Sequence, residues 1–153
     1  MRILCSACLL GARCRYNGEG KPSQRVLALL KDHELIPVCP EQLGGLSTPR
    51  PPCEMQGDGR VISKLGDDKS AEFTRGAEES LMLLRLTGCE AALLKARSPS
   101  CGKGMIYDGS FSGTLKPGNG VFAQRLIDEG VPVYTEEDDL PFLSSVFCWQ
   151  QQL

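Results

Sequence analysis

Apolar and polar positions along the chain form blocks that predict strands and helices in turn. Short apolar runs typical of buried strands lie at 2–8, 35–39, 91–95 and 131–134. Apolar residues recur at helical spacing over 23–34, 70–87 and 121–129. Strands that alternate with helices favour a parallel sheet with helices on both faces. We therefore expect an α/β fold: one three-layer, Rossmann-like domain over 1–153 with a mostly parallel sheet.

Local signals mark the ends of the predicted helices. Ser23 can cap the first helix, Gly88 can end the second, and Asn119 can cap the third, which should stop at Gly130. Pro37 lacks the N–H that a central ladder position needs, so the second strand should lie near an edge of the sheet.

Two stretches rich in glycine and proline interrupt this pattern. The first, 40–68, should be mostly loop around a short strand at 60–63. The second, 98–120, should hold a small hairpin that pairs 105–107 with 110–111. Loops of this length inside a compact domain are usually functional. After the last strand, Asp138 or Asp139 with Pro141 should open a C-terminal helix.

Composition narrows the class of protein. The 153 residues are 41% hydrophobic and 24% charged, which is typical of a globular chain with a sizeable core. The net charge of −2 offers no general basic field for a nucleic-acid polymer, so we expect no such partner. No run approaches the roughly 18 apolar residues of a membrane helix, and the N-terminal run is too short for a signal peptide. We expect a cytoplasmic protein that does not bind a membrane.

Three of the eight cysteines fall at comparable places in the predicted fold. Cys8 and Cys39 lie at the ends of the first two predicted strands, and Cys101 lies in the loop after the third. The carboxyl ends of parallel strands share one rim of a sheet, so the three thiolates could converge there. Three thiolates without an obvious fourth partner suit an iron–sulfur cluster with one open iron better than structural zinc. The alternative is that these cysteines are ordinary small buried residues.

Other cysteines suggest further possibilities. Cys5 and Cys8 form a C-x-x-C pair, and a thioredoxin-like redox motif is therefore an alternative to cluster binding. Such a motif should open a helix with its first cysteine exposed, whereas Cys5 lies inside the apolar strand. Cys14 is a reserve ligand or a neighbour, because its loop could fold back over Cys8. The remaining three, which we interpret as structural, are Cys53, Cys89 and Cys148.

Several motifs occur in order along nearly the whole chain. They are S-A-C-L-L-G at 6–11, C-R-Y-N-G at 14–18, V-C-P-E-Q-L-G-G-L at 38–46, T-P-R-P-P at 48–52, L-K-A-R-S-P-S-C-G at 94–102 and I-Y-D-G at 106–109. Together they closely resemble the thiouracil desulfidase family, in its short single-domain form.

The resemblance implies a 4Fe-4S cluster held by three cysteines, whose fourth iron binds the sulfur removed from a thiolated uracil. Carried onto this sequence, the ligands are Cys8, Cys39 and Cys101, although Cys14 also lies in a family motif and could replace one of them. Cys5 and Cys53 depart from the family pattern without disturbing its motifs.

The resemblance also bears on substrate and partners. Larger relatives carry a second domain and act on thiolated tRNA, and we expect no such domain in this protein. The short proteins are linked to 4-thiouracil compounds, including the nucleoside monophosphate. We therefore expect a small-molecule thiolated pyrimidine as substrate, cluster assembly machinery as a partner, and a monomer or weak homodimer.

Hydrolysis of a C=S bond needs a group that takes a proton from water and returns one. A carboxylate of raised pKa beside a cluster could do this, and Glu41, two residues after Cys39, is the candidate. Its alternative role is a helix first-turn acid. Ser98 and Ser100 could orient substrate or water, or could simply make turn hydrogen bonds.

Glycines and basic residues nearby could bind a phosphate group. The candidates are Gly44, Gly45, Gly102 and Lys103, with Lys21 or Arg50 nearby. Such glycines commonly just make turns. Tyr16 and Tyr107 could stack on a pyrimidine or pack as ordinary aromatic residues. The single histidine, His33, should be solvated at a helix end, and its being alone excludes a His-rich zinc site.

Two other functions remain open from the sequence. A thiol–disulfide oxidoreductase that uses Cys5 and Cys8 would work without iron. A carrier or sensor would bind an iron–sulfur cluster or zinc but turn over no thio-substrate.

Overall fold

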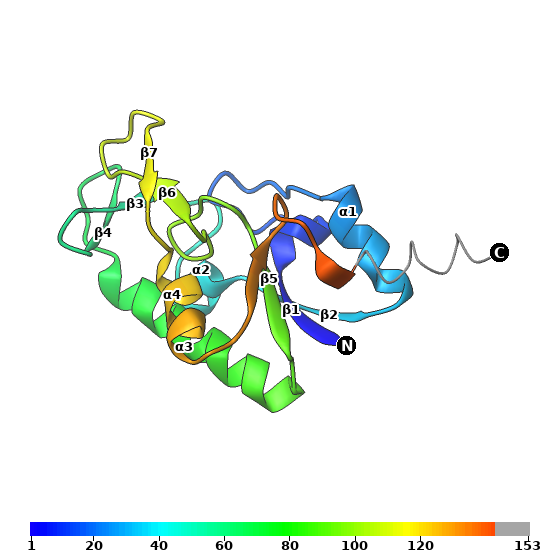
Figure 1. Ribbon diagram of the computed structural model, residues 1–153. Coiled ribbons are helices and arrows are strands. Elements are labelled where there is room, and N and C mark those ends of the chain that lie inside the picture. Colours follow the sequence, from blue (N-terminus) through cyan, green and yellow to red (C-terminus); the bar gives the residue numbers. More distant parts are fainter. Residues whose placement is uncertain (143–153) are drawn as a thin grey trace.

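The computed structural model describes residues 1–142, and a four-stranded sheet lies at its centre in the order β2-β1-β5-β8 (Figure 1). Its strands are β1 (Arg2–Ser6), β2 (Glu34–Val38), β5 (Ala91–Leu94) and β8 (Val133–Thr135). All three pairings are parallel, which confirms the predicted sheet. Pro37 lies in β2, an edge strand of this sheet, as its missing N–H predicted.

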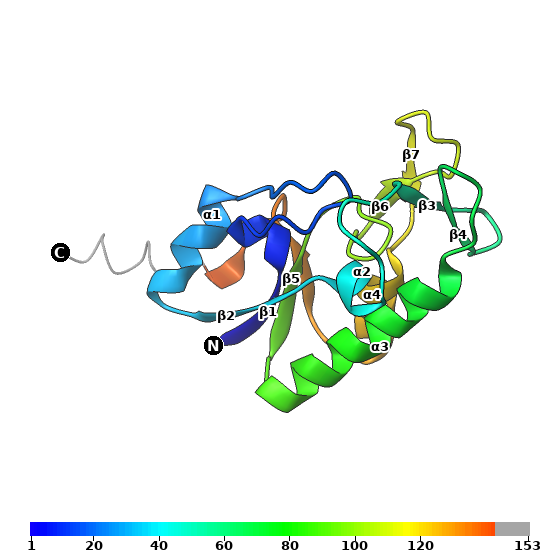
Figure 2. The same cartoon turned by 180° about the vertical axis from the view of Figure 1, so that it is seen from behind.

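Helical segments cover both faces of the sheet (Figures 1 and 2). They are η1 (Ala7–Leu10), α1 (Gln24–Leu27), η2 (Ala28–Lys31), α2 (Pro40–Leu43), α3 (Ser70–Thr87) and α4 (Val121–Asp128). The short α1 and η1 lie on one face, and α3 and α4 lie together on the other. The three-layer prediction is therefore confirmed.

Alternation of side chains along the strands divides the core into two halves. On β1, Ile3 and Cys5 pack with residues of η1 and α1, whereas Leu4 packs with α3 and α4. On β5, Leu93 and Leu94 separate in the same way, and both are fully buried. Because a strand has a side-chain period of two, a continuous apolar run fills both halves at once.

Two glycines allow α2 and α3 to touch through their backbones. A Cβ atom at Gly76 would lie 1.9 Å from the carbonyl oxygen of Pro40, and one at Gly44 would lie 2.0 Å from that of Glu72. Any side chain at either position would push the helices apart. This contact fixes the position of α2, the helix that carries Glu41.

Two antiparallel hairpins lie next to each other beyond the carboxyl ends of the sheet strands (Figure 1). They are β3 (Cys53–Met55) with β4 (Val61–Ser63), and β6 (Met105–Tyr107) with β7 (Leu115–Pro117). The predicted second strand at 110–111 was wrong, because Ser110 forms a turn by donating to the side chain of Asp108. Cys53 begins a strand rather than lying in a loop.

The ends of several elements also differ from prediction. The first strand stops at Ser6, because 7–10 forms a 3-10 turn that Gly11 ends in the left-handed region. Gly120, not Asn119, precedes α4, since the Asn119 side chain accepts from the Gly104 N–H at 2.8 Å. The ring nitrogens of His33 are buried rather than solvated.

Other end signals acted as predicted. The Ser23 side chain accepts from the Val26 N–H, and Gly88 ends α3 in the left-handed region. The first predicted helix is split into α1 and η2 and ends at Lys31. Most of the predicted C-terminal helix, and Cys148, lie outside the described residues. Within residues 1–142, no helix has the length and hydropathy that crossing a bilayer requires.

Candidate functional site

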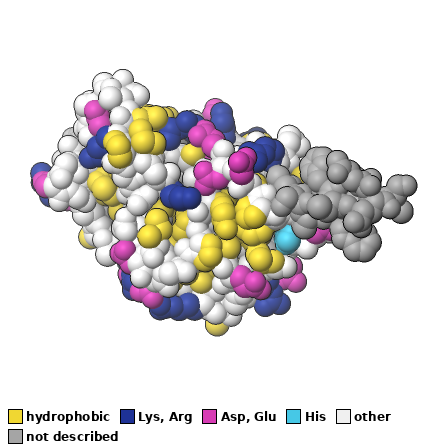
Figure 3. Space-filling view, viewed as in Figure 1, with side chains coloured by type: hydrophobic (Ala, Val, Ile, Leu, Met, Phe, Trp, Pro, Cys, Tyr) yellow, Lys and Arg dark blue, Asp and Glu magenta, His cyan; other side chains and the backbone are white. Residues whose placement is uncertain are grey.

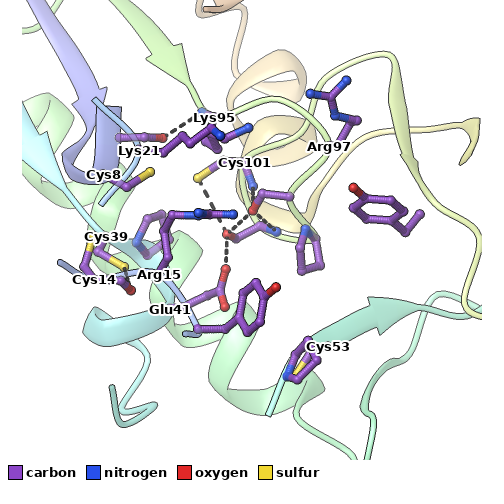
Figure 4. Close-up of a pocket in the computed structure, with 18 of the residues that line it drawn as sticks. Cys8, Cys14, Arg15, Lys21, Cys39, Glu41, Cys53, Lys95, Arg97 and Cys101 are labelled. Carbon is purple, nitrogen blue, oxygen red and sulfur yellow. Dashed lines mark hydrogen bonds between the residues drawn. The ribbon is translucent and has the colours of Figure 1, made fainter. Parts of the chain in front are cut away.

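A cavity of about 530 Å³ lies at the carboxyl ends of the sheet strands (Figure 4). Ser6 at the end of β1, Val38 at the end of β2 and Lys95 just after β5 line it. Residues of both hairpins also line it, and its volume is within the usual range for a small-molecule site. The cavity thus lies at the edge of the parallel sheet where ligands are expected to bind.

Five cysteines line this cavity, and Cys53 of β3 lies apart from the other four (Figure 4). Cys8 comes from η1, Cys14 from the following loop, Cys39 from the position just before α2, and Cys101 from the loop after β5. The Cys39 thiol donates to the Cys14 carbonyl oxygen at 3.7 Å. Figure 4 shows the four sulfur atoms around the same hollow. The structure therefore brings together the three predicted ligands and their reserve.

The free thiols of the cavity form no cage for a single metal ion. Within residues 1–142, no three His, Cys, Asp or Glu side chains approach closely enough to hold one ion. All seven described cysteines are free, so no disulfide occupies these thiols. A cuboidal iron–sulfur cluster presents its irons at separate corners and accepts one thiolate at each. The donor set thus fits a cluster better than structural zinc.

Burial keeps two of these thiols protonated when no metal is bound. Burial raises the pKa of Cys101 to about 12. A hydrogen bond with Cys14, together with burial, raises the pKa of Cys39 well above its ordinary value. Metal binding to such thiols releases their protons.

Cys5 lies away from the cavity in the core beneath η1 and α1. Its side chain has no exposed area, and burial raises its pKa to about 12. A redox-active C-x-x-C pair needs an accessible thiolate, which this position does not provide. The geometry therefore disfavours the thiol–disulfide alternative.

Glu41 lies in the first turn of α2 and is held between a cation and a hydroxyl group. One carboxylate oxygen, Oε1, accepts from Nε of Arg50 at 3.2 Å, and Oε2 accepts from the Ser100 hydroxyl at 2.9 Å. The Glu41 and Arg50 side chains are 14% and 5% exposed, so this ion pair is largely buried. The carboxylate thus lies at the N-terminal end of α2, and its Oε2 atom points toward the loop that carries Cys101.

Arg50 orders the mouth of the site through several carbonyl and hydroxyl groups. Its guanidinium donates to the carbonyl oxygens of Cys14 and Ser47 and to the hydroxyl of Thr48. The same side chain therefore ties the Cys14 loop to Glu41, a connection that the sequence did not reveal.

Ser98 and Ser100 combine the two roles that the sequence left open. The Ser98 hydroxyl accepts from the backbone N–H groups of Ser100 and Cys101, which is turn chemistry. The two hydroxyls are also 2.9 Å apart, and that of Ser100 lies 3.6 Å from the Cys101 sulfur. A continuous chain of polar groups thus runs from Arg50 through Glu41 to Cys101.

Basic side chains surround the cavity. They are Arg15, Lys21, Arg50, Lys64, Lys95 and Arg97. Lys95 pairs with Glu136 at 2.9 Å, and Arg97 pairs with Glu137 at 2.6 Å. Among the described residues, Arg15, Lys21 and Lys64 form no ion pair. Figure 3 shows basic and acidic side chains side by side near the upper edge of the molecule.

Three aromatic residues also line the cavity: Tyr16, Tyr107 and Phe111. The first two were candidates from the sequence, and Phe111 was missed. Arg15, Lys64, Lys95 and Arg97 were missed as well. For three of these residues the sequence did carry a signal. Arg15 directly follows Cys14, and Lys95 and Arg97 come just after the end of a strand.

The predicted phosphate-binding glycines and Lys103 lie outside the cavity lining. Gly44 makes the contact with α3, and Gly45 adopts a left-handed conformation just after it. A Cβ atom at Gly102 would lie 2.7 Å from the Ser98 carbonyl oxygen. The Lys103 ammonium donates to the Val133 carbonyl oxygen at 3.0 Å and pairs with Asp138. Gly44 and Gly102 therefore serve close backbone packing, and Lys103 forms an ion pair away from the cavity.

Comparison with known proteins agrees with this geometry. The family model of the 2-thiouracil desulfurases matches residues 3–138. The Uncharacterized protein YbbK of Bacillus subtilis (strain 168) is 37% identical over 145 residues, which cover 89% of this chain and 96% of that protein. The solved structure of a 4Fe-4S-dependent thiouracil desulfidase, TudS, is 44% identical, with a TM-score of 0.85 over 97% of this chain and 98% of that one.

The chain belongs to the 2-thiouracil desulfurase family. The resemblance drawn from its sequence motifs is confirmed, as is the α/β fold with a mostly parallel sheet.

Proposed function

We propose that this protein hydrolyses the C=S bond of a thiolated uracil compound and releases the uracil form and hydrogen sulfide. The observation that carries the proposal is a single cavity in which the predicted ligand cysteines face the hydrogen-bonded pair of Glu41 and Ser100. Family membership and the similarity to a 4Fe-4S-dependent thiouracil desulfidase support it. No net electron transfer is needed.

Cys8, Cys39 and Cys101 would hold a 4Fe-4S cluster. They come from the ends of three neighbouring sheet strands, and their surroundings offer thiols and no competing imidazole. When bound, such a cluster supplies an open iron, a soft Lewis acid suited to sulfur. Cys14 remains a neighbour of this ligand set, and its carbonyl oxygen accepts from the Cys39 thiol.

The side chains of this protein handle the protons. Glu41 Oε2 is the acceptor for a proton from the water that attacks the ring carbon, and the Ser100 hydroxyl can pass the proton between them. Arg50 holds Oε1 on the opposite side, so that Oε2 keeps its direction. The proton then returns to the ring nitrogen or to the departing sulfur.

Charge at the cavity mouth favours a nucleotide over the free base. Arg15, Lys21 and Lys64 line the cavity without an acidic partner among the described side chains. A phosphate group would give these cations a counter-charge, whereas free 4-thiouracil would not. Among 4-thiouracil, 4-thiouridine and 4-thio-UMP, we therefore propose 4-thio-UMP as the preferred substrate.

Anaerobic reconstitution with iron and sulfide tests the proposal. We expect about four irons per chain, together with catalytic loss of the 4-thio-UMP absorbance and release of sulfide and UMP. The same amount of iron without turnover of any of the three thio-compounds would instead indicate a carrier or sensor.

Serine variants test the ligand set. Cys8→Ser, Cys39→Ser and Cys101→Ser should each lose the cluster and the activity. Cys89→Ser is the matched control, because Cys89 is also a free thiol but lies outside the cavity lining. Normal iron content in any of the three variants would contradict that residue's assignment.

A further inference from the structure

The turn at 108–112 brings Phe111 to the cavity and holds it in an uncommon backbone conformation. Phe111 lines the cavity, is half-buried and has a φ angle of +56°. A bulky residue seldom adopts this left-handed conformation, which persists only where its surroundings enforce it. Phe111 is one of two such non-glycine residues in the described chain, and the other, Arg97, also lines the cavity.

A buried carboxylate enforces this conformation. Oε1 of Glu54 accepts from the backbone N–H of Gly109 at 3.0 Å and from that of Phe111 at 3.1 Å. Glu54 is 9% exposed and forms no ion pair with any described residue. Burying a carboxylate is costly, and these two N–H groups are the compensation that the structure provides.

The segment that follows this strand clamps the turn from a second side. Gln56, two residues after Glu54, donates from its side-chain nitrogen to the Gly109 carbonyl oxygen at 3.2 Å. A Cβ atom at Gly109 would lie 2.9 Å from the Met55 carbonyl oxygen, so the turn is pressed against the strand that carries Glu54. The turn is therefore docked on the neighbouring hairpin rather than left free over the cavity.

We propose that Phe111 is a specificity-determining residue whose ring forms a wall against the pyrimidine of the substrate, and that Glu54 is the positioning residue that holds it there. The inference rests on the proposed function, because it takes the ligand to be a uracil compound. Aromatic side chains bind nucleobases by stacking on their faces. Tyr16 and Tyr107 line the same cavity, so the pyrimidine would bind among three aromatic side chains.

Phe111→Gly separates a binding role from a structural one. Glycine adopts a φ of +56° without strain, so the variant should unfold at the same temperature as the wild type or higher. Loss of the ring should weaken UMP binding to the reconstituted protein by about ten-fold, measured by calorimetry. The KM for 4-thio-UMP should rise to a similar extent, with kcat within about two-fold.

Ser112→Gly is the matched control, because it introduces glycine into the same turn at an exposed residue outside the cavity lining. It should bind UMP like the wild type. Equal weakening in both glycine variants would overturn the role of the Phe111 ring.

Variants of Glu54 test the positioning role. Glu54→Ala should increase amide hydrogen exchange at Gly109 and Phe111 at least about ten-fold and should weaken UMP binding like Phe111→Gly. Glu54→Gln keeps an oxygen that can accept from both N–H groups, so it should restore protection and binding. Unchanged exchange in Glu54→Ala, or a Glu54→Gln variant as defective as Glu54→Ala, would overturn this role.

The outcomes distinguish this inference from the proposed function. If the wild type turns over 4-thio-UMP but Phe111→Gly binds UMP normally, only the role of Phe111 is overturned. If the reconstituted wild type neither binds UMP nor desulfurates any thiouracil compound, the proposed function fails and this inference fails with it.

Discussion

Ser100 donates a 2.9 Å hydrogen bond to the carboxylate of Glu41, although 59 positions separate them in the sequence. Ser100 precedes a candidate cluster ligand, and Glu41 follows another by two residues. The bond thus connects the loop after β5 to the first turn of α2 across the cavity. It brings a proton acceptor beside the sulfur atoms on which the proposed reaction depends.

Loss of this pair should slow the reaction without loss of the cluster. Glu41→Gln removes the proton acceptor and should lower kcat by about 10²–10⁴-fold. Ser100→Ala removes one charge-assisted hydrogen bond and should lower kcat by roughly 10–100-fold. Initial rates with 4-thio-UMP, normalised to iron content, measure both effects. Ser112→Ala, at an exposed serine outside the cavity lining, is the control, and wild-type kcat in Glu41→Gln would rule out the role of Glu41 as base.

The Cys5 thiol should be unreactive in the native protein. Its thiol is fully buried and its pKa is raised to about 12, so little thiolate exists at pH 8. In the folded protein, iodoacetamide should label Cys5 far more slowly than the half-buried Cys89, as mass spectrometry of peptides would show. Cys5→Ala should retain iron and desulfidase activity. Loss of activity in Cys5→Ala with iron content preserved would revive the thiol–disulfide alternative.

Close contact between α2 and α3 should make Gly76 intolerant of any side chain. A methyl group there would meet the Pro40 carbonyl oxygen, and the resulting overpacking should lower the free energy of unfolding by roughly 1–3 kcal/mol. Denaturant unfolding of Gly76→Ala measures this loss. Gly57→Ala is the control, because nothing lies near a Cβ atom at that position. Equal stability of the two variants would contradict the contact.

Unpaired cations at the cavity should discriminate between nucleotide and base. A Lys21→Gln, Lys64→Gln double variant removes two positive charges that line the cavity. The KM for 4-thio-UMP should rise several-fold and become less sensitive to salt, while the KM for 4-thiouracil stays the same. Lys31→Gln, at the end of η2 and outside the cavity lining, is the control. An equal rise for both substrates would argue against phosphate binding at these lysines.

Local rules were sufficient for most of the fold. The apolar run at 91–95 and the helix ended by Gly88 formed as predicted, because strand burial and left-handed glycine caps depend on a few consecutive residues. The shared rim of a parallel sheet also predicted that Cys8, Cys39 and Cys101 would approach one another. Family motifs then indicated what such a site does.

Element ends were harder to predict where distant groups compete for the same side chain. Asn119 has the chemistry of a helix cap, but its oxygen binds the Gly104 N–H instead. The second strand of the β6–β7 hairpin lies at 115–117, because Glu54 of the other hairpin accepts from the N–H groups of Gly109 and Phe111 and holds that segment as a turn. Two local solutions were available in each case, and tertiary packing selected one.

By itself, the sequence determined the order of strands and helices, the buried apolar runs and the cysteines that follow strand ends, since periodicity and turn chemistry act over short distances. Only the tertiary structure decided that Arg50 pairs with Glu41, that Glu54 holds the turn of Phe111, and that Lys103 lies away from the cavity. These contacts join loops that the chain does not place together. They depend on how the hairpins dock over the sheet, and no local pattern encodes that docking.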